Sequence, residues 1–272
     1  PNGLADVNHF HAAGGMGFLI RELLDAGYLH EDVQTIWGQG LCAYAIEPRL
    51  GEYGAVVRVK APRESGDDKV LTPAERPFQT TGGLKLLVGN LGHAIVKTSA
   101  VKPENRIIEA PAMVFHSQEE LNDAFKAGQL DRDFVAVVRF QGPRANGMPE
   151  LHRLTTVLGV LQDRGRKVAL VTDGRMSGAS GKVLAAIHVT PEALDGGAIA
   201  KIVEGDVISI DANSGSLQVL ADEQSFAARA PATPDLSANG FGMGRELFSG
   251  MRALASRADM GASVFAPVNS SL

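Results

Sequence analysis

The sequence predicts an α/β protein, with an α/β layer or barrel in the part that follows residue 79. Two observations support this class. Short apolar runs typical of strands alternate there with amphipathic helical stretches, and glycine or proline separates the segments. The length of 272 residues and the content of 44% hydrophobic and 21% charged residues are typical of a globular protein with one large or two ordinary domains.

The first part of the chain contains one clear helix, at residues 14–29. Its apolar face consists of Phe18, Leu19, Leu23 and Leu24, and Gly27 is expected to cap its C-terminus. Residues 51–78 differ, because they are charged, contain three prolines and show no sustained period. We therefore expect them to connect two structural units, residues 1–78 and residues 79–272.

The second part is expected to be rich in strands. These are predicted at residues 84–90, 94–101, 112–117, 134–140 and 167–173, with short final strands within 206–220 around a hairpin turn at 213–215.

Two helices are expected among these strands. Ser117 and Glu120 form a capping box before the first, which Gly128 closes. Pro149 is expected at the first position of the second, which ends before Gly165. The apolar stripe of this second helix consists of Leu151, Leu154, Leu158 and Leu161.

Composition excludes several classes of function. The net charge of −5 is spread without a basic stripe, which argues against nucleic acid, and no apolar run is long enough to span a bilayer. Cys42 is the only cysteine, so an internal disulfide or a self-contained zinc or iron–sulfur site is excluded.

The cytoplasm is the expected compartment. Because the chain opens without an initiator Met, we expect its true N-terminus to lie upstream.

Two loops stand out because each directly follows a predicted strand. The first is "QGPRANGMPEL" (141–151), and the second lies within "VTDGRMSGASGK" (171–182). Loops that leave the carboxyl ends of strands are where α/β sheets bind ligands. If the two strands are parallel neighbours, Glu150, Ser177 and the backbone amides of 174–181 share one crevice.

Each of these residues also has a purely structural interpretation. Glu150 in a first helical turn would complement the helix dipole, and Ser177 and Ser180 would serve as turn or capping residues. Asp173 would cap its loop and pair with Arg175. His188 fits a packed or surface histidine better than a ligand.

Two general motifs fail on spacing. A phosphate-binding P-loop requires a glycine where Met176 stands and a serine or threonine where Val183 stands. A nucleophile elbow requires glycines two residues before and after its serine, which neither Ser177 nor Ser180 has.

The stretch "LVTDGRMSGASG" is similar to the C-terminal signature of the dihydroxy-acid and phosphogluconate dehydratase family. "GGLKLLVGNLGHAIVKTSAV" (82–101), "QGPRANGMPEL" and "HVTPEALDGG" fit the same family. "PNGLADVNHFHAAGG", "GYLHEDV" and "PDLSANGFGMGRELF" resemble the member that acts on 6-phospho-D-gluconate. The resemblance runs from end to end of the chain.

The resemblance implies a hydro-lyase that converts 6-phospho-D-gluconate to 2-dehydro-3-deoxy-6-phospho-D-gluconate in the Entner–Doudoroff pathway. It implies an iron–sulfur cluster, with no ligands in this chain, and a magnesium ion. It also implies a homodimer, and a C-terminal swivelling β-barrel domain with flanking helices after the end of an N-terminal α/β domain. Cys42 lies outside the cluster motifs and is expected to be a buried core thiol.

The resemblance also assigns roles to residues. Ser177 would be the base that removes the C2 proton, and Glu150 a magnesium ligand, for which a hard oxygen is suitable. Substrate binding would fall to Asp173, Gly174, Arg175, Gly178, Ser180 and Arg144. A phosphate on the substrate requires a basic pocket, for which Arg144, Lys182 and Arg245 are candidates. Two alternatives stay open: a dehydratase for other dihydroxy or sugar acids, and a non-catalytic domain that retains the fold.

Overall fold

The computed structural model describes residues 5–176 and 181–265 of the chain, which folds as two compact units, residues 1–82 and residues 83–272. Each unit is described by itself. No helix in the described ranges is both long and apolar enough to cross a membrane.

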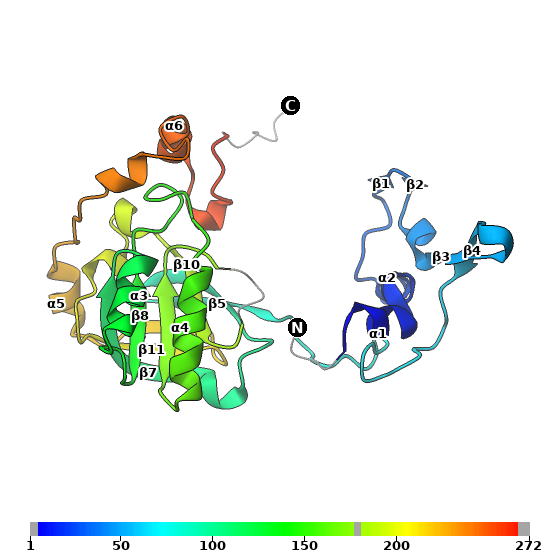
Figure 1. Ribbon diagram of the computed structural model, residues 1–272, viewed down its shortest axis with the longest axis horizontal. Helices are drawn as coiled ribbons and strands as arrows, with labels where there is room; N and C mark the ends of the chain where they lie inside the picture. Colours follow the sequence, from blue (N-terminus) through cyan, green and yellow to red (C-terminus); the bar gives the residue numbers. More distant parts are fainter. Residues whose placement is uncertain (1–4, 177–180, 266–272) are drawn as a thin grey trace. The chain divides into compact units, whose positions relative to one another are not determined.

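The first unit is small and consists mainly of helices and hairpins (Figure 1). The helix expected at 14–29 is confirmed as α2, and Gly27 follows it with the left-handed φ of 72° that glycine adopts without strain. The elements are α1 (Val7–Ala12), α2 (Gly15–Asp25), β1 (Gln34–Thr35), β2 (Gly38–Gln39), β3 (Ile46–Leu50) and β4 (Val56–Lys60), with short 3₁₀ turns at Cys42–Ala45 and Glu52–Gly54.

The segment 51–78 is not a plain connection, as its composition suggested. Its first part contains β4, which pairs with β3 in an antiparallel hairpin. A later part lies along α2, where the Ala74 N–H donates to the Glu22 carboxylate (3.1 Å) and Leu71 is buried. Tertiary contacts therefore order a stretch whose sequence lacks any period.

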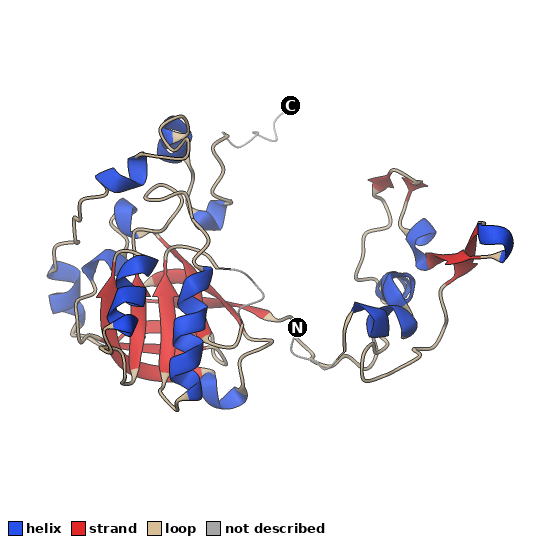
Figure 2. Ribbon diagram, in the orientation of Figure 1, coloured by secondary structure: helices blue, strands red, loops and turns tan. Residues whose placement is uncertain are grey.

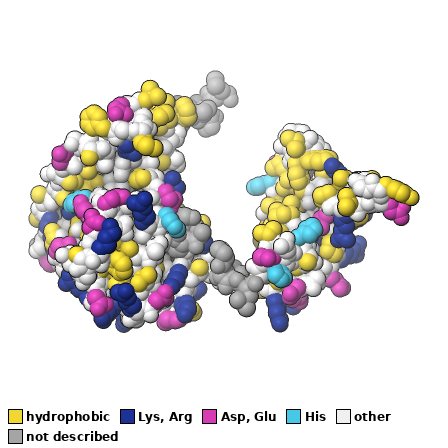
Figure 3. All heavy atoms as spheres, in the orientation of Figure 1, with side chains coloured by type: hydrophobic (Ala, Val, Ile, Leu, Met, Phe, Trp, Pro, Cys, Tyr) yellow, Lys and Arg dark blue, Asp and Glu magenta, His cyan; other side chains and the backbone are white. Residues whose placement is uncertain are grey.

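The first unit buries little apolar surface. Its hydrophobic cluster contains Ala13, Phe18 and Leu71, while Ile36 is 94% exposed. Hydrophobic side chains are conspicuous on its surface (Figure 3). Cys42 is exposed, so the expectation of a buried core thiol is wrong: the surrounding residues of this unit are too few to enclose it.

The second unit is a closed eight-stranded barrel with flanking helices, which confirms the predicted α/β class and, of its two forms, the barrel (Figure 2). The strand order is β10-β6-β5-β12-β11-β7-β8-β9, and β9 closes the barrel onto β10. The strands are β5 (Leu84–Gly89), β6 (Gly92–Lys97), β7 (Ile107–Phe115), β8 (Phe134–Val138), β9 (Val168–Thr172), β10 (Leu184–Thr190), β11 (Val207–Asp211) and β12 (Ser216–Val219).

Helices cover part of the barrel. α3 and α4 lie against each other on one side of it, and α6 lies beyond one end of the barrel (Figure 1). The helices are α3 (Gln118–Lys126), α4 (His152–Asp163), α5 (Glu223–Ala228) and α6 (Ser249–Leu254). One hydrophobic cluster fills the barrel, and a second lies between the barrel wall and the helices α3 and α4.

One strand is missing from the prediction and two local predictions need correction. β10 is not among the predicted strands, and a bulge between Ile187 and Thr190 interrupts its register with β6. α4 begins at His152 after its N-cap Leu151, so Pro149 precedes the helix. Ser117 caps α3 as expected, but the Glu120 carboxylate accepts the N–H of His116 (2.7 Å) instead of that of the cap residue.

Candidate active site at the carboxyl ends of the parallel strands

The strands β7, β8, β9 and β10 are parallel neighbours, so their carboxyl ends share one edge of the barrel. The loop after β8 meets the loop after β9 at that edge. The Leu151 N–H donates to the Arg175 carbonyl (3.2 Å), and Glu150 and Arg175 form an isolated parallel bridge. The strands within 134–140 and 167–173 are therefore parallel neighbours, which is the condition under which the two loops were expected to meet.

Asp173 is the central positioning group of this edge. Its side chain is completely buried, and its carboxylate accepts the N–H groups of Phe140 (3.1 Å), Gln141 (2.9 Å) and Ala193 (2.9 Å). These groups come from the loops after β8 and β10. Its oxygens thus hold the backbone of these loops, and its expected role in substrate binding stays a prediction.

Glu192 is a second buried carboxylate, which sequence reasoning did not identify. It is 4% exposed and accepts the N–H groups of Arg144 (3.1 Å) and Ala145 (3.0 Å). A Cβ at Gly142 would collide with its carboxylate, so this glycine allows the close approach. Glu192 lies in the stretch "TPE" at the end of β10, and because this strand is not predicted from the sequence, the carboxylate that follows it is not predicted either.

Both carboxyls have perturbed pKa values. Burial raises the pKa of Asp173 to about 6, although its backbone donors oppose the shift. Burial also raises the pKa of Glu192 to about 7, with further contributions from the charges of Asp173 and Asp195. Perturbed groups of this kind gather at functional sites, and here they join three loops.

Gly174 has no room for a side chain. A Cβ there would lie 2.7 Å from the Gln141 Cβ and 2.8 Å from a Leu151 methyl group. Its carbonyl also accepts the His188 N–H (2.9 Å). This glycine therefore packs the loops against each other and against β10.

Arg175 and Glu150 form a partly exposed ion pair, with 3.1 Å between Nη1 and Oε2. The Arg175 Nε also donates to the Met148 carbonyl (2.7 Å). Arg175 therefore pairs with Glu150 and not with Asp173, and Glu150 precedes the N-cap of α4, so it does not lie in a first helical turn. The long arginine side chain can reach across the two loops, whereas Asp173 points into the protein.

His188 lies next to this site, where its N–H donates to the Gly174 carbonyl. It is half-buried in the bulge of β10 and adopts a left-handed φ of 56°. Burial and then the charge of Arg175 lower the pKa of His188, so its neutral form is favoured. Non-glycine residues in this conformation often occur at functional sites.

The remaining loop candidates, Ser177, Gly178 and Ser180, lie outside the described residues. Their roles stay predictions.

The described residues do not form a metal centre by themselves. They contain no group of three or more His, Cys, Asp or Glu side chains that could hold a metal ion. Glu150 offers one accessible carboxylate, which fits a single ligand of a magnesium ion. The one cysteine does not fit an iron–sulfur cluster.

The three basic side chains that are candidates for binding a substrate phosphate do not lie in one region. Lys182 pairs with Asp163 at the end of α4 (2.5 Å), toward the barrel edge where β9 begins. Arg144 lies in the loop after β8, and Arg245 reaches the same loop by donating to Asn146 Oδ1 (2.6 Å). Arg144 and Arg245 therefore belong to one region, and Lys182 to another.

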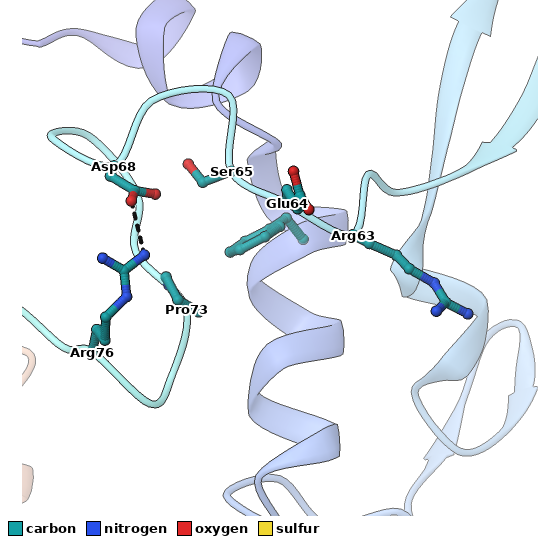
Figure 4. Close-up of a pocket in the computed structure, with 7 residues that line it drawn as sticks. Arg63, Glu64, Ser65, Asp68, Pro73 and Arg76 are labelled. Atoms are coloured by element: carbon teal, nitrogen blue, oxygen red, sulfur yellow. Dashed lines mark hydrogen bonds and ion pairs between the residues drawn. The ribbon is translucent and has the colours of Figure 1, made fainter.

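The first unit contains a cavity of its own, of about 400 Å³ (Figure 4). Arg76 forms an ion pair with Asp68 there (2.8 Å), while the Arg63 side chain points away. The two arginines of its lining are balanced by Asp68 and Glu64. The cavity thus has no excess charge that would favour an ionic ligand.

Comparison with known proteins identifies the family. The model "Dihydroxy-acid/6-phosphogluconate dehydratase C-terminal" matches residues 69–262, and the corresponding N-terminal model matches residues 1–44. The chain belongs to the dihydroxy-acid/6-phosphogluconate dehydratase family. The expected membership is confirmed, and the barrel with the candidate site is the family's C-terminal domain.

Individual members of this dehydratase family differ in their sequence identity to the chain. The chain is 67% identical to a phosphogluconate dehydratase of Rhizobium meliloti and 58% identical to one of Pseudomonas aeruginosa, in each case over 97% of the chain. A dihydroxy-acid dehydratase of Caldanaerobacter subterraneus is 37% identical over 82% of the chain. These matches cover 44%, 43% and 38% of the relatives, so the chain spans less than half of their length.

Proposed function

We propose that the protein to which this chain belongs dehydrates 6-phospho-D-gluconate to 2-dehydro-3-deoxy-6-phospho-D-gluconate, in the Entner–Doudoroff pathway of the cytoplasm. The proposal rests on the difference in sequence identity between two groups of relatives. Proteins named phosphogluconate dehydratase are 49–67% identical over nearly the whole chain, against 37% for the dihydroxy-acid dehydratase. The reaction removes the C2 proton and the C3 hydroxyl as water, and the resulting enol becomes the 2-keto acid.

In this proposal the described residues build and orient the site. Asp173 and Glu192 fix the loops after β8 and β10 through five backbone hydrogen-bond donors, which come from Phe140, Gln141, Ala193, Arg144 and Ala145. Gly174 lets these loops pack closely. The loop that carries Ser177 therefore starts from a rigid base, which favours accurate placement of a catalytic group.

We assign proton abstraction to Ser177, as an alkoxide. A serine hydroxyl becomes a strong base only in electropositive surroundings, and the partly exposed Arg175 guanidinium lies two residues before it. A magnesium ion held in part by Glu150 would supply further positive charge near the substrate carboxylate. The iron–sulfur cluster also belongs to this proposal, but the described residues offer no ligand set for it.

The substrate is tested by turnover in the full-length enzyme. We expect 6-phosphogluconate to be consumed in preference to 2,3-dihydroxyisovalerate. The opposite preference would favour the branched-chain alternative, and failure to turn over either acid would favour a non-catalytic domain.

The base is tested with Ser177→Ala, and Ser180→Ala serves as the matched control in the same loop. A general base contributes roughly 10²–10⁴-fold, so kcat should fall by at least about 10²-fold in Ser177→Ala and by far less in the control. Exchange of the C2 proton with deuterated solvent tests abstraction without departure of hydroxide. Wild-type exchange in Ser177→Ala would show that another group is the base.

A further inference from the structure

A second cavity, of about 260 Å³, lies in the barrel unit between the loop after β8 and the C-terminal arm, residues 229–265. Arg144 lines it from the loop, and Arg252 lines it from α6. Asn239 and Ser249 add polar groups, and among the described residues no carboxylate belongs to its lining. Sites for whole small ligands usually have about 300–1,000 Å³, so this cavity suits one end of a ligand.

The charge of this cavity is positive. Arg144 is ion-paired with Asp195, which holds its guanidinium in place. Arg252 is half-buried and donates to the Arg245 carbonyl (2.9 Å), but in the described ranges no carboxylate lies within 4.0 Å of it. Within the described residues Arg252 therefore forms no direct ion pair, although the charge of Glu246 acts on it at longer range. An anionic group in the cavity would pair with it directly.

The cavity is lined in part by the same loop that carries Glu150 of the candidate active site. A Cβ at Gly147 would be 3.2 Å from the Arg252 Cδ, and the next residue, Met148, accepts the Arg175 Nε through its carbonyl (2.7 Å). Arg245 anchors the arm here through Asn146 (2.6 Å). The cavity and the Glu150–Arg175 pair thus share the loop after β8, so one extended ligand is a candidate to contact both.

A further cavity with two cations, over α3 and α4, lacks these features. Its Lys126 and Arg153 side chains are 75% and 72% exposed. Each is near an acid on the same surface, Asp123 at 3.0 Å and Glu119 at 3.9 Å. Solvated pairs of this kind contribute little to binding.

We infer that the cavity between Arg144 and Arg252 binds the phosphate group of the substrate. This inference rests on the proposed function and adds the residues that distinguish a phosphorylated sugar acid from an unphosphorylated one. A phosphate monoester carries about −1.5 to −2 charges at pH 7 and presents oxygens that match the fork of a guanidinium group.

The test uses the full-length enzyme with Arg252→Gln and Arg144→Gln, with 6-phosphogluconate and D-gluconate as paired ligands. A hydrogen bond to a charged group is worth about 1.5–3 kcal/mol. The Kd for D-gluconate divided by the Kd for 6-phosphogluconate, both measured by calorimetry, should therefore fall about 10- to 100-fold in each variant. Arg252→Lys, which keeps the charge without the fork, should lose less. Inorganic phosphate should also become a weaker competitive inhibitor.

Arg257→Gln is the matched control, because Arg257 lies in the same arm and pairs with Asp259 (2.6 Å). This control should keep the wild-type ratio. Far-UV circular dichroism shows whether each variant is folded, and Arg144→Gln tests the site independently if Arg252→Gln is not. Folded variants that keep the wild-type preference for 6-phosphogluconate would overturn the inference. Failure of the wild type to turn over 6-phosphogluconate would instead overturn the proposed function.

Discussion

The two units of this chain use hydrogen-bonded secondary structure in different ways. In the barrel, eight strands close on themselves and bury one hydrophobic cluster inside and another under α3 and α4. In the first unit, the hairpins leave hydrophobic side chains exposed, including Ile36 at 94% and Val56 at 70%. Backbone pairing therefore occurs in both units, but only the closed sheet removes much apolar area from water, which is the dominant stabilising term.

The aromatic residues make this difference measurable. Trp37 and the three tyrosines, Tyr28, Tyr44 and Tyr53, all lie in the first unit. Intrinsic tryptophan fluorescence therefore reports on that unit, whereas most of the far-UV circular dichroism comes from the barrel.

The largest effect is expected when the units are separated. Residues 83–272 expressed alone should unfold cooperatively in urea, because the barrel has a continuous core. Residues 1–82 alone should show no cooperative transition by Trp37 fluorescence, because their cluster is too small. A sharp transition in the isolated first unit would contradict the comparison.

A core truncation should affect the units unequally. Leu170 is fully buried in β9, so Leu170→Ala should lower the free energy of unfolding of the barrel by about 2–5 kcal/mol in urea titrations followed by circular dichroism. Leu50 in β3 is 80% exposed, and Leu50→Ala is the control, with an expected change within about 0.5 kcal/mol. Equal losses would mean that the exposed leucine also packs against something.

The buried carboxylates predict a pH dependence that is confined to the barrel. The folded-state pKa of Glu192 is raised to about 7, so the native state binds more protons than the unfolded state between about pH 4.5 and 7. Its contribution to stability is present at low pH and is lost as the pH rises through 7.

Glu192→Gln should remove this dependence. The slope of unfolding free energy against pH should become less negative by up to about 1.4 kcal/mol per pH unit in that interval. Glu223→Gln, in α5, is the control and should keep the wild-type slope. An unchanged slope in Glu192→Gln would show that this carboxyl titrates normally.

The smallest expected effect concerns Cys42. Because it is exposed, its thiol should react with a disulfide reagent in the native protein without a preceding unfolding step. Cys42→Ser should abolish the reaction and change the stability of the barrel by less than about 0.5 kcal/mol. Protection of the thiol until the protein unfolds would restore the original expectation of a buried residue.

Elements whose signals are local can be predicted from the amino-acid sequence alone. The helix around Phe18, the cap at Ser117, and the strand before and the helix after the 141–151 loop follow from periodicity and turn chemistry. The family motifs likewise lie in contiguous stretches. They mark Ser177, Glu150 and Asp173 as candidate site residues.

The residues that meet at the carboxyl ends of the parallel strands are set by tertiary contacts. Closure of the barrel brings β10 beside β9, which places Glu192 under the loop after β8 and brings the Ala193 N–H to Asp173. The proximity of Arg252 to Gly147 depends in the same way on the path of the C-terminal arm. Such contacts join residues far apart in the chain, and their energy depends on burial and distance in three dimensions, which no local pattern of residues encodes.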